Sequence, residues 1–64
     1  MAATKTLQER QAELQALLGT PAGREELQGL ETRYYEASGR LRPASTSLIT
    51  YILVHEREQG LIGD

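Results

Sequence analysis

The chain has 64 residues, no cysteine and a formal net charge of −2. This length allows one domain with a thin core, and the lack of cysteine excludes disulfides and thiolate metal ligands. The slight negative charge gives no global attraction to nucleic acid or to an anionic membrane, so either partner would have to bind a local patch. We therefore expect residues 1–64 to form a single small domain of marginal stability, stabilised by regular helix packing or by a partner.

Targeting signals are not evident in the sequence. The first eleven residues, MAATKTLQERQ, lack the apolar segment of a signal peptide. No apolar run approaches the length of about 18 residues that a membrane span needs. These observations predict a soluble, cytoplasmic protein without a membrane partner.

The first helix is predicted over about residues 6–18. Thr6 and Glu9 have the spacing of a capping box, in which each side chain binds a backbone N–H that the first turn leaves unpaired. At roughly 100° per residue, four leucines fall within about a third of the circumference: Leu7, Leu14, Leu17 and Leu18. Gly19 is expected to end this helix, because glycine adopts the left-handed conformation at little cost.

The second helix is predicted over residues 21–38. Thr20 suits the N-cap, and Pro21 suits the first helical position, where a missing N–H costs nothing. Gly39 is expected to end the helix. The inward face is predicted to consist of Leu27, Leu30, Tyr34 and Ala37. Tyr35 lies outside this face and should be partly exposed.

The third helix is predicted over about residues 46–59. It should start within Ser45–Ser47, after the extended step that proline imposes on the residue before it, and Gly60 should end it. Leu61 is expected to fold back on the last turn as part of the glycine cap. Because short connections make neighbouring helices turn back on each other, the three segments predict an all-α fold, a small three-helix bundle.

A helical projection of the third segment separates a core side from an outer side. The core side contains Leu48, Ile49, Ile52 and Leu53. Tyr51 and His55 flank this side. Val54 falls on the outer side, whose other residues are polar, and it is therefore expected to lie outside the core.

The chain lacks the residues that catalysis or metal binding would need. One histidine and no cysteine cannot build a Ser-His-Asp or Cys-His arrangement within this chain, whose single aspartate is its last residue. His55 and Glu58 lie one turn apart, but two ligands do not make a metal site, and His55 is interpreted as a partly buried or surface residue. The pairs Glu25-Glu26 and Glu56/Glu58 are interpreted as solvated faces. We expect no enzyme activity, metal or cofactor.

Our leading hypothesis is a non-enzymatic protein–protein interaction module. Val54, together with Tyr51 and Tyr35, would form an apolar patch, and such patches on small proteins often mark docking or self-association sites. The module would therefore self-associate or dock on a larger partner through the outer side of the third helix.

The alternative is a helix-turn-helix-like DNA-binding protein, a transcriptional regulator with the third helix as recognition helix. Arg40 and Arg42 would contact phosphates, and Thr46, Ser47 and Thr50 would face the groove. Three features disfavour this alternative. The turn is longer than the three or four residues usual in the motif, the early helix offers no side chain for bidentate base recognition, and the chain is acidic. Nucleic acid is therefore the less favoured partner.

Overall fold

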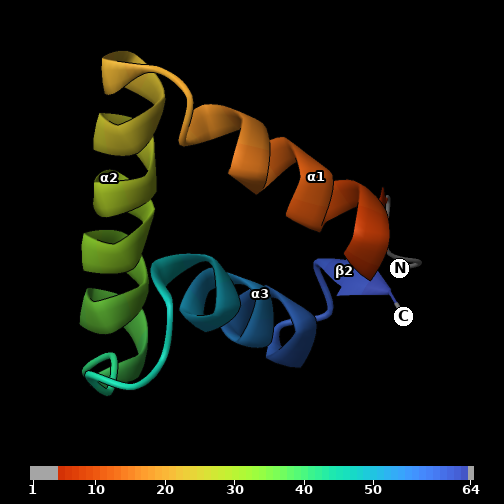
Figure 1. Ribbon diagram of the computed structural model, residues 1–64. Coiled ribbons are helices and arrows are strands. Elements are labelled where there is room, and N and C mark those ends of the chain that lie inside the picture. The colour runs from red at the N-terminus through yellow and green to blue at the C-terminus, as the bar shows by residue number, and fades with distance from the viewer. Residues whose placement is uncertain (1–4, 64) are drawn as a thin grey trace.

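The computed structural model describes residues 5–63. Within them lie three helices, α1 (Leu7–Leu17), α2 (Pro21–Ser38) and α3 (Leu48–Glu58). Each helix packs against the other two, and the core lies between them (Figure 1). The expected all-α three-helix bundle is confirmed, and the observed helix bounds differ from the predicted ones by at most two residues.

Hydroxyl side chains determine where each helix begins. The hydroxyl of Thr6 accepts a hydrogen bond from the N–H of Glu9 at 3.1 Å, and the Glu9 carboxylate accepts one from the N–H of Thr6 at 2.9 Å, so the predicted capping box is present. Thr20 accepts from the third residue of α2 at 2.9 Å. Ser47 caps α3 in the same way, accepting from the N–H of Thr50 at 3.2 Å.

Left-handed glycines end α2 and α3. Gly39 has a φ of 73° and Gly60 a φ of 75°, as the sequence predicted for both positions. The N–H of Leu61 then donates to the carbonyl of Glu56 at 2.9 Å. This bond satisfies a carbonyl that the last turn of α3 leaves without a partner, so the backbone of the expected glycine cap is confirmed, whereas the side chain of Leu61 stays 52% exposed.

The connection between α1 and α2 depends on a close approach of two backbones. The prediction that Gly19 ends α1 in a left-handed conformation is wrong, because Leu18 caps the helix in a right-handed conformation and no positive φ occurs at Gly19. Gly23 is buried in the first turn of α2. A Cβ there would lie 2.1 Å from the carbonyl oxygen of Leu17. Position 23 therefore requires glycine for reasons of space rather than of backbone angle.

Two short strands join the ends of the described chain. β1 (Lys5–Thr6) pairs in parallel with β2 (Ile62–Gly63), and both lie beside the start of α1 (Figure 1). Ile62 is buried and belongs to the core. The sequence shows no alternating pattern for so short a pair, and we predicted no strand.

The core of residues 5–63 contains six buried hydrophobic residues: Leu14, Leu27, Tyr34, Ile52, Leu53 and Ile62. Six partly buried hydrophobic residues pack against this core. Five of them were predicted to face inward, namely Leu7, Leu17, Leu30, Leu48 and Ile49, and the sixth is Tyr51. The predictions for Leu18 and Ala37 are wrong, because both are exposed. Leu18 stands at the corner after α1, and Ala37 lies at about 80° from Leu27 on the helical projection, at the edge of the inward face.

Candidate functional site

The outer side of α3 carries an exposed valine. Ile52 is fully buried and Leu53 nearly so, whereas the side of the helix that carries Val54 leaves this residue 50% exposed. The prediction that Val54 lies outside the core is therefore confirmed. Isolated exposed valines are ordinary, so the surroundings of Val54 decide whether it forms part of a site.

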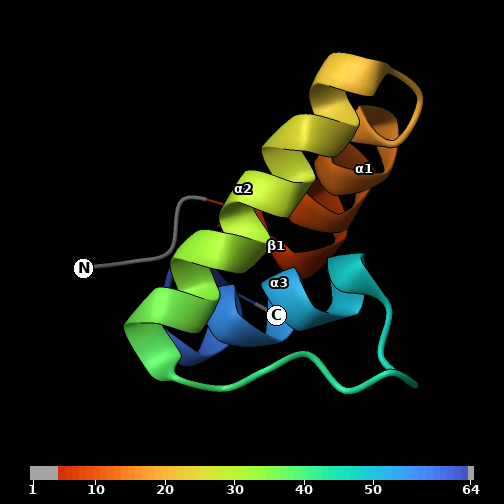
Figure 2. The ribbon, with the colours of Figure 1, turned by 90° about the vertical axis from the view of Figure 1, so that its left-hand side faces the viewer.

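A surface groove of about 330 Å³ lies between α3 and the loop 39–47 that precedes it. Figure 2 shows this loop as an extended segment that runs from the end of α2 to the start of α3. The apolar lining of the groove consists of Leu41, Pro43, Tyr51 and Val54. Leu41 is 75% exposed, more than any other large hydrophobic residue described. Two exposed aliphatic side chains thus share one groove.

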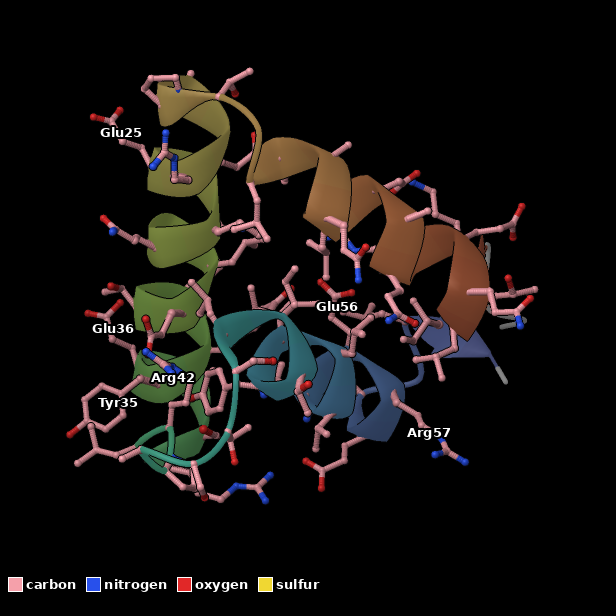
Figure 3. The ribbon with its side chains drawn as sticks, in the orientation of Figure 1. Glu25, Tyr35, Glu36, Arg42, Glu56 and Arg57 are labelled. Atoms are coloured by element: carbon pink, nitrogen blue, oxygen red, sulfur yellow. The ribbon has the colours of Figure 1, made fainter. Side chains whose placement is uncertain are left out.

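Arg42 holds the loop against α2. Its Nε donates to Oε2 of Glu31 at 2.9 Å, and its Nη1 donates to the carbonyl of Thr46 at 2.8 Å. The side chain of Arg42 lies beside α2 in Figure 3. One guanidinium group therefore ties α2 to both halves of the loop, so the wall of the groove is preformed.

Arg40 and Tyr51 hold the loop against α3. The hydroxyl of Tyr51 donates to the carbonyl of Arg40 at 2.7 Å, and the Arg40 guanidinium pairs with the carboxylate of Glu58. The hydrogen bond to Glu58 raises the pKa of Arg40 above its usual value. Both charged side chains also line the groove and remain largely exposed. A cation and an anion therefore stand side by side at its rim.

Four of the five residues considered for DNA contact, Arg40, Arg42, Ser47 and Thr50, use their side chains in internal hydrogen bonds, and the fifth, Thr46, takes part through its backbone. Arg40 and Arg42 each pair with a carboxylate. The hydroxyl of Ser47 caps α3 and lies 2.8 Å from the hydroxyl of Thr50. The connection between α2 and α3 spans residues 39–47, longer than the turn of a helix-turn-helix motif. DNA binding stays a prediction, and it would have to release these groups.

Tyr35 lies apart from the other residues of the expected interface. Tyr51 and Val54 line the groove, whereas Tyr35 does not. Tyr35 projects from α2 on the side away from α3 (Figure 3) and is 42% exposed. A single exposed tyrosine of this kind is common on protein surfaces. Of the three residues predicted for the interface, Tyr51 and Val54 therefore lie together in the groove and Tyr35 does not. Leu41, which was not predicted, lies in the groove with them.

A buried carboxylate joins the three helices. Glu56 is 3% exposed and points from α3 toward α1 (Figure 3). Arg10 of α1 donates to both of its oxygens, from Nε at 2.8 Å and from Nη2 at 2.9 Å, and the hydroxyl of Tyr34 on α2 donates at 2.7 Å. The interpretation of Glu56 as part of a solvated face is wrong, although Glu25 and Glu58 are exposed as expected.

The hydrogen bonds keep this carboxylate ionised. Burial by itself raises the pKa of Glu56, but the hydrogen bonds from Arg10 and Tyr34 outweigh burial and hold the pKa below its usual value. The hydrogen bond to Glu56 also raises the pKa of Arg10. Burial, followed by the hydrogen bond to Glu56, raises the pKa of Tyr34 to about 12. Glu56 therefore serves as a structural tie at neutral pH and is not poised as an acid.

His55 extends this polar cluster by an aromatic contact. It is buried, and its ring stacks on that of Tyr34 with centroids 4.1 Å apart and planes 16° from parallel. Of the two environments that the sequence left open for His55, the structure selects the buried one. Among residues 5–63, no group of three His, Asp or Glu side chains is placed to hold a metal ion.

The sequence contains a signal for the buried pair. With Leu48 at zero on the helical projection, Glu56 falls at about 80°, in the middle of the core side, which spans roughly 0° to 140°. With Leu7 at zero, Arg10 falls at about 300°, between Leu17 and Leu14. Two opposite charges thus lie on the core faces of two helices, a pattern that favours an interhelical ion pair over two solvated charges.

Known proteins supply no guide to the role of this groove. Comparison with protein families, with curated proteins and with solved structures gave no match for this chain. Within the described part, residues 5–63, none of the helices has the length and apolar character needed to cross a bilayer. The function has to be inferred from the groove and from the polar contacts around it.

Proposed function

We propose that this chain is a non-enzymatic protein–protein interaction module that binds through the groove beside α3. One observation carries the proposal: Leu41 and Val54 are 75% and 50% exposed and line the same groove. Apolar area removed from water stabilises a complex by roughly 25 cal/mol per Å² before the costs of association are subtracted. Exposed aliphatic side chains that share a preformed groove are therefore suited to contact another protein.

The charged groups support binding rather than catalysis. Glu56 is buried, but both of its oxygens accept hydrogen bonds within the chain. At the rim of the groove, Arg40 and Glu58 neutralise each other. Catalytic acids and bases typically have pKa values tuned toward the working pH, whereas hydrogen bonds hold the pKa of Glu56 below its usual value and that of Arg40 above its usual value. The lack of cysteine fits a reducing compartment, so we place the module in the cytoplasm.

Site-specific crosslinking in the cells that produce the protein tests this proposal. A photoreactive phenylalanine analogue replaces Val54 in one variant and Tyr35 in a matched variant, since both positions are about half-exposed. We expect protein adducts from position 54 but not from position 35, and adding Leu41→Asp should abolish them. Circular dichroism verifies that each variant folds. Absence of adducts at position 54, or equal adducts at both positions, would show that the groove is not a docking site.

A further inference from the structure

We infer that a second copy of this chain occupies the groove, related by a twofold axis beside the Arg40–Glu58 pair. The inference rests on the proposed function and specifies the partner.

The apolar part of the groove is self-complementary. Leu41 projects from the loop 39–47, and beside it lies the hollow lined by Tyr51 and Val54. In a twofold dimer, the same patch of both chains meets, so residue contacts are reciprocal. Each Leu41 can then enter the hollow of the other chain. One patch therefore provides both the inserted side chain and the site that receives it.

A second hollow extends this surface along α3. Val54 and Thr50 line the groove and also a depression of about 260 Å³ between α1 and α3. Leu7 and Leu53 contribute apolar atoms to that depression. Val54 therefore forms a ridge between two hollows. A second copy can match this shape if the ridge of each copy enters a hollow of the other.

The charges of the rim are also self-complementary. Arg40 and Glu58 give the rim one positive and one negative charge, although the whole chain carries −2. About a twofold axis beside this pair, Arg40 of each copy approaches Glu58 of the other, so the four charges alternate in sign. Such alternation avoids the cost of like charges in contact. The rim formed by this pair offers no net charge to a strongly acidic or basic partner, although Arg57 adds one positive charge at the second hollow.

The thin core gives self-association a physical advantage. The largest side chains that are fully buried within residues 5–63 are Leu14, Leu27 and Ile52. Small chains without disulfides commonly gain stability from regular helix packing, metals or oligomerisation. Covering Leu41 and Val54 between two copies would add apolar burial that a chain of 64 residues cannot provide alone.

Exchange of the rim charges tests the dimer by analytical ultracentrifugation. Arg40→Glu and Glu58→Arg each place like charges across the axis, so each variant alone should self-associate at least tenfold more weakly than the wild type. In an equimolar mixture, opposite charges face each other again, and association should return to within about threefold of the wild type. Loss of the internal pair cannot explain this rescue, because both variants still lack it in the mixture. A mixture that associates no better than its components overturns the inference.

Matched variants separate the dimer from the broader proposal. Val54→Asp should abolish self-association without altering the rim charges, whereas Tyr35→Asp should leave it unchanged, and circular dichroism confirms that both fold. If the wild type keeps its monomer mass of 7.1 kDa at millimolar concentration while position 54 still gives adducts with a different protein, the second copy is excluded and the proposed function stands. If position 54 gives no adducts either, both fail.

Discussion

Neutralisation of Glu56 should destabilise the bundle more than the loss of an exposed carboxylate. In Glu56→Gln, the side chain keeps its size but loses the charge that Arg10 and Tyr34 bind at 2.7–2.9 Å. Removing one member of a buried ion pair costs about 3–5 kcal/mol, because the remaining charge loses its partner. Arg10 remains 22% exposed and keeps its contact with Glu13. We therefore expect a loss of about 2–3 kcal/mol in the free energy of unfolding.

Urea denaturation at pH 7, followed by circular dichroism at low protein concentration, measures this loss. A domain of this length has a free energy of unfolding of about 3–10 kcal/mol, so the change is large enough to resolve. Glu13→Gln is the matched control, since it removes an exposed partner of the same arginine and should have a far smaller effect. Equal effects of the two substitutions would refute the reasoning that the buried carboxylate ties the three helices together.

The pH dependence of the free energy of unfolding provides a second test of the role of Glu56 with the same variant. The pKa of Glu56 is lower in the folded chain than its usual value of 4.5, so the ionised carboxylate stabilises the fold above that pH. This stabilisation is lost as the pH falls through the lower pKa of the folded state, because the unfolded state binds the proton first. Glu56→Gln should therefore show a shallower loss of stability in acid than the wild type. Parallel acid profiles would contradict the assigned direction of the shift.

Further predictions concern α2. Gly23→Ala should lower the free energy of unfolding by about 3 kcal/mol, because the added Cβ would meet the backbone of Leu17. Gly29→Ala should raise it by about 0.5–1 kcal/mol, because a Cβ at position 29 would lie in open space. Thermal melts compare the two variants, and a loss of stability in Gly29→Ala would show that this face of α2 is covered. Since the pKa of Tyr34 is about 12 when folded and 10.0 otherwise, the unfolded state loses this proton first. The free energy of unfolding should therefore fall by about 2–3 kcal/mol as the pH rises from the lower to the higher of these two pKa values. Urea titrations at alkaline pH measure this fall, and Tyr34→Phe should remove the contribution of Tyr34 to it.

The helices could be predicted from the sequence because their signals are local. Thr6 with Glu9, and Thr20 with Pro21, mark helix starts within a few residues of chain, and the spacing of leucines gives the buried faces. The parallel pair of strands joins residues from opposite ends of the described chain. Such a pairing is non-local and too short to leave a periodic pattern, so the sequence did not predict it.

The buried ion pair could be predicted only in part. The helical projection places Glu56 and Arg10 on core faces, but we assigned Glu56 from its residue type rather than from its position. Their pairing joins residues 46 positions apart and depends on how α1 crosses α3. Position on a helix can therefore identify a charge that needs a partner, whereas the identity of that partner follows from the tertiary fold.

The groove could not be predicted from the sequence, because its shape depends on the path of the irregular loop 39–47. Helical periodicity was enough to predict that Val54 is exposed, but Leu41 lines the groove because Arg42 and Tyr51 hold the loop 39–47 by hydrogen bonds. No local pattern encodes these contacts. The sequence consequently grouped Tyr35 with Val54, although the fold directs Tyr35 to the other side of α2.

Methyl chemical shifts over a concentration series test most directly that a second copy covers the groove. The methyl resonances of Leu41 and Val54 should shift or broaden as the protein concentration rises toward millimolar. Those of Leu18, which is also exposed but lies at the corner between α1 and α2, should stay unchanged. Groove resonances that remain constant over the whole series, or equal changes at Leu18, would contradict the twofold dimer.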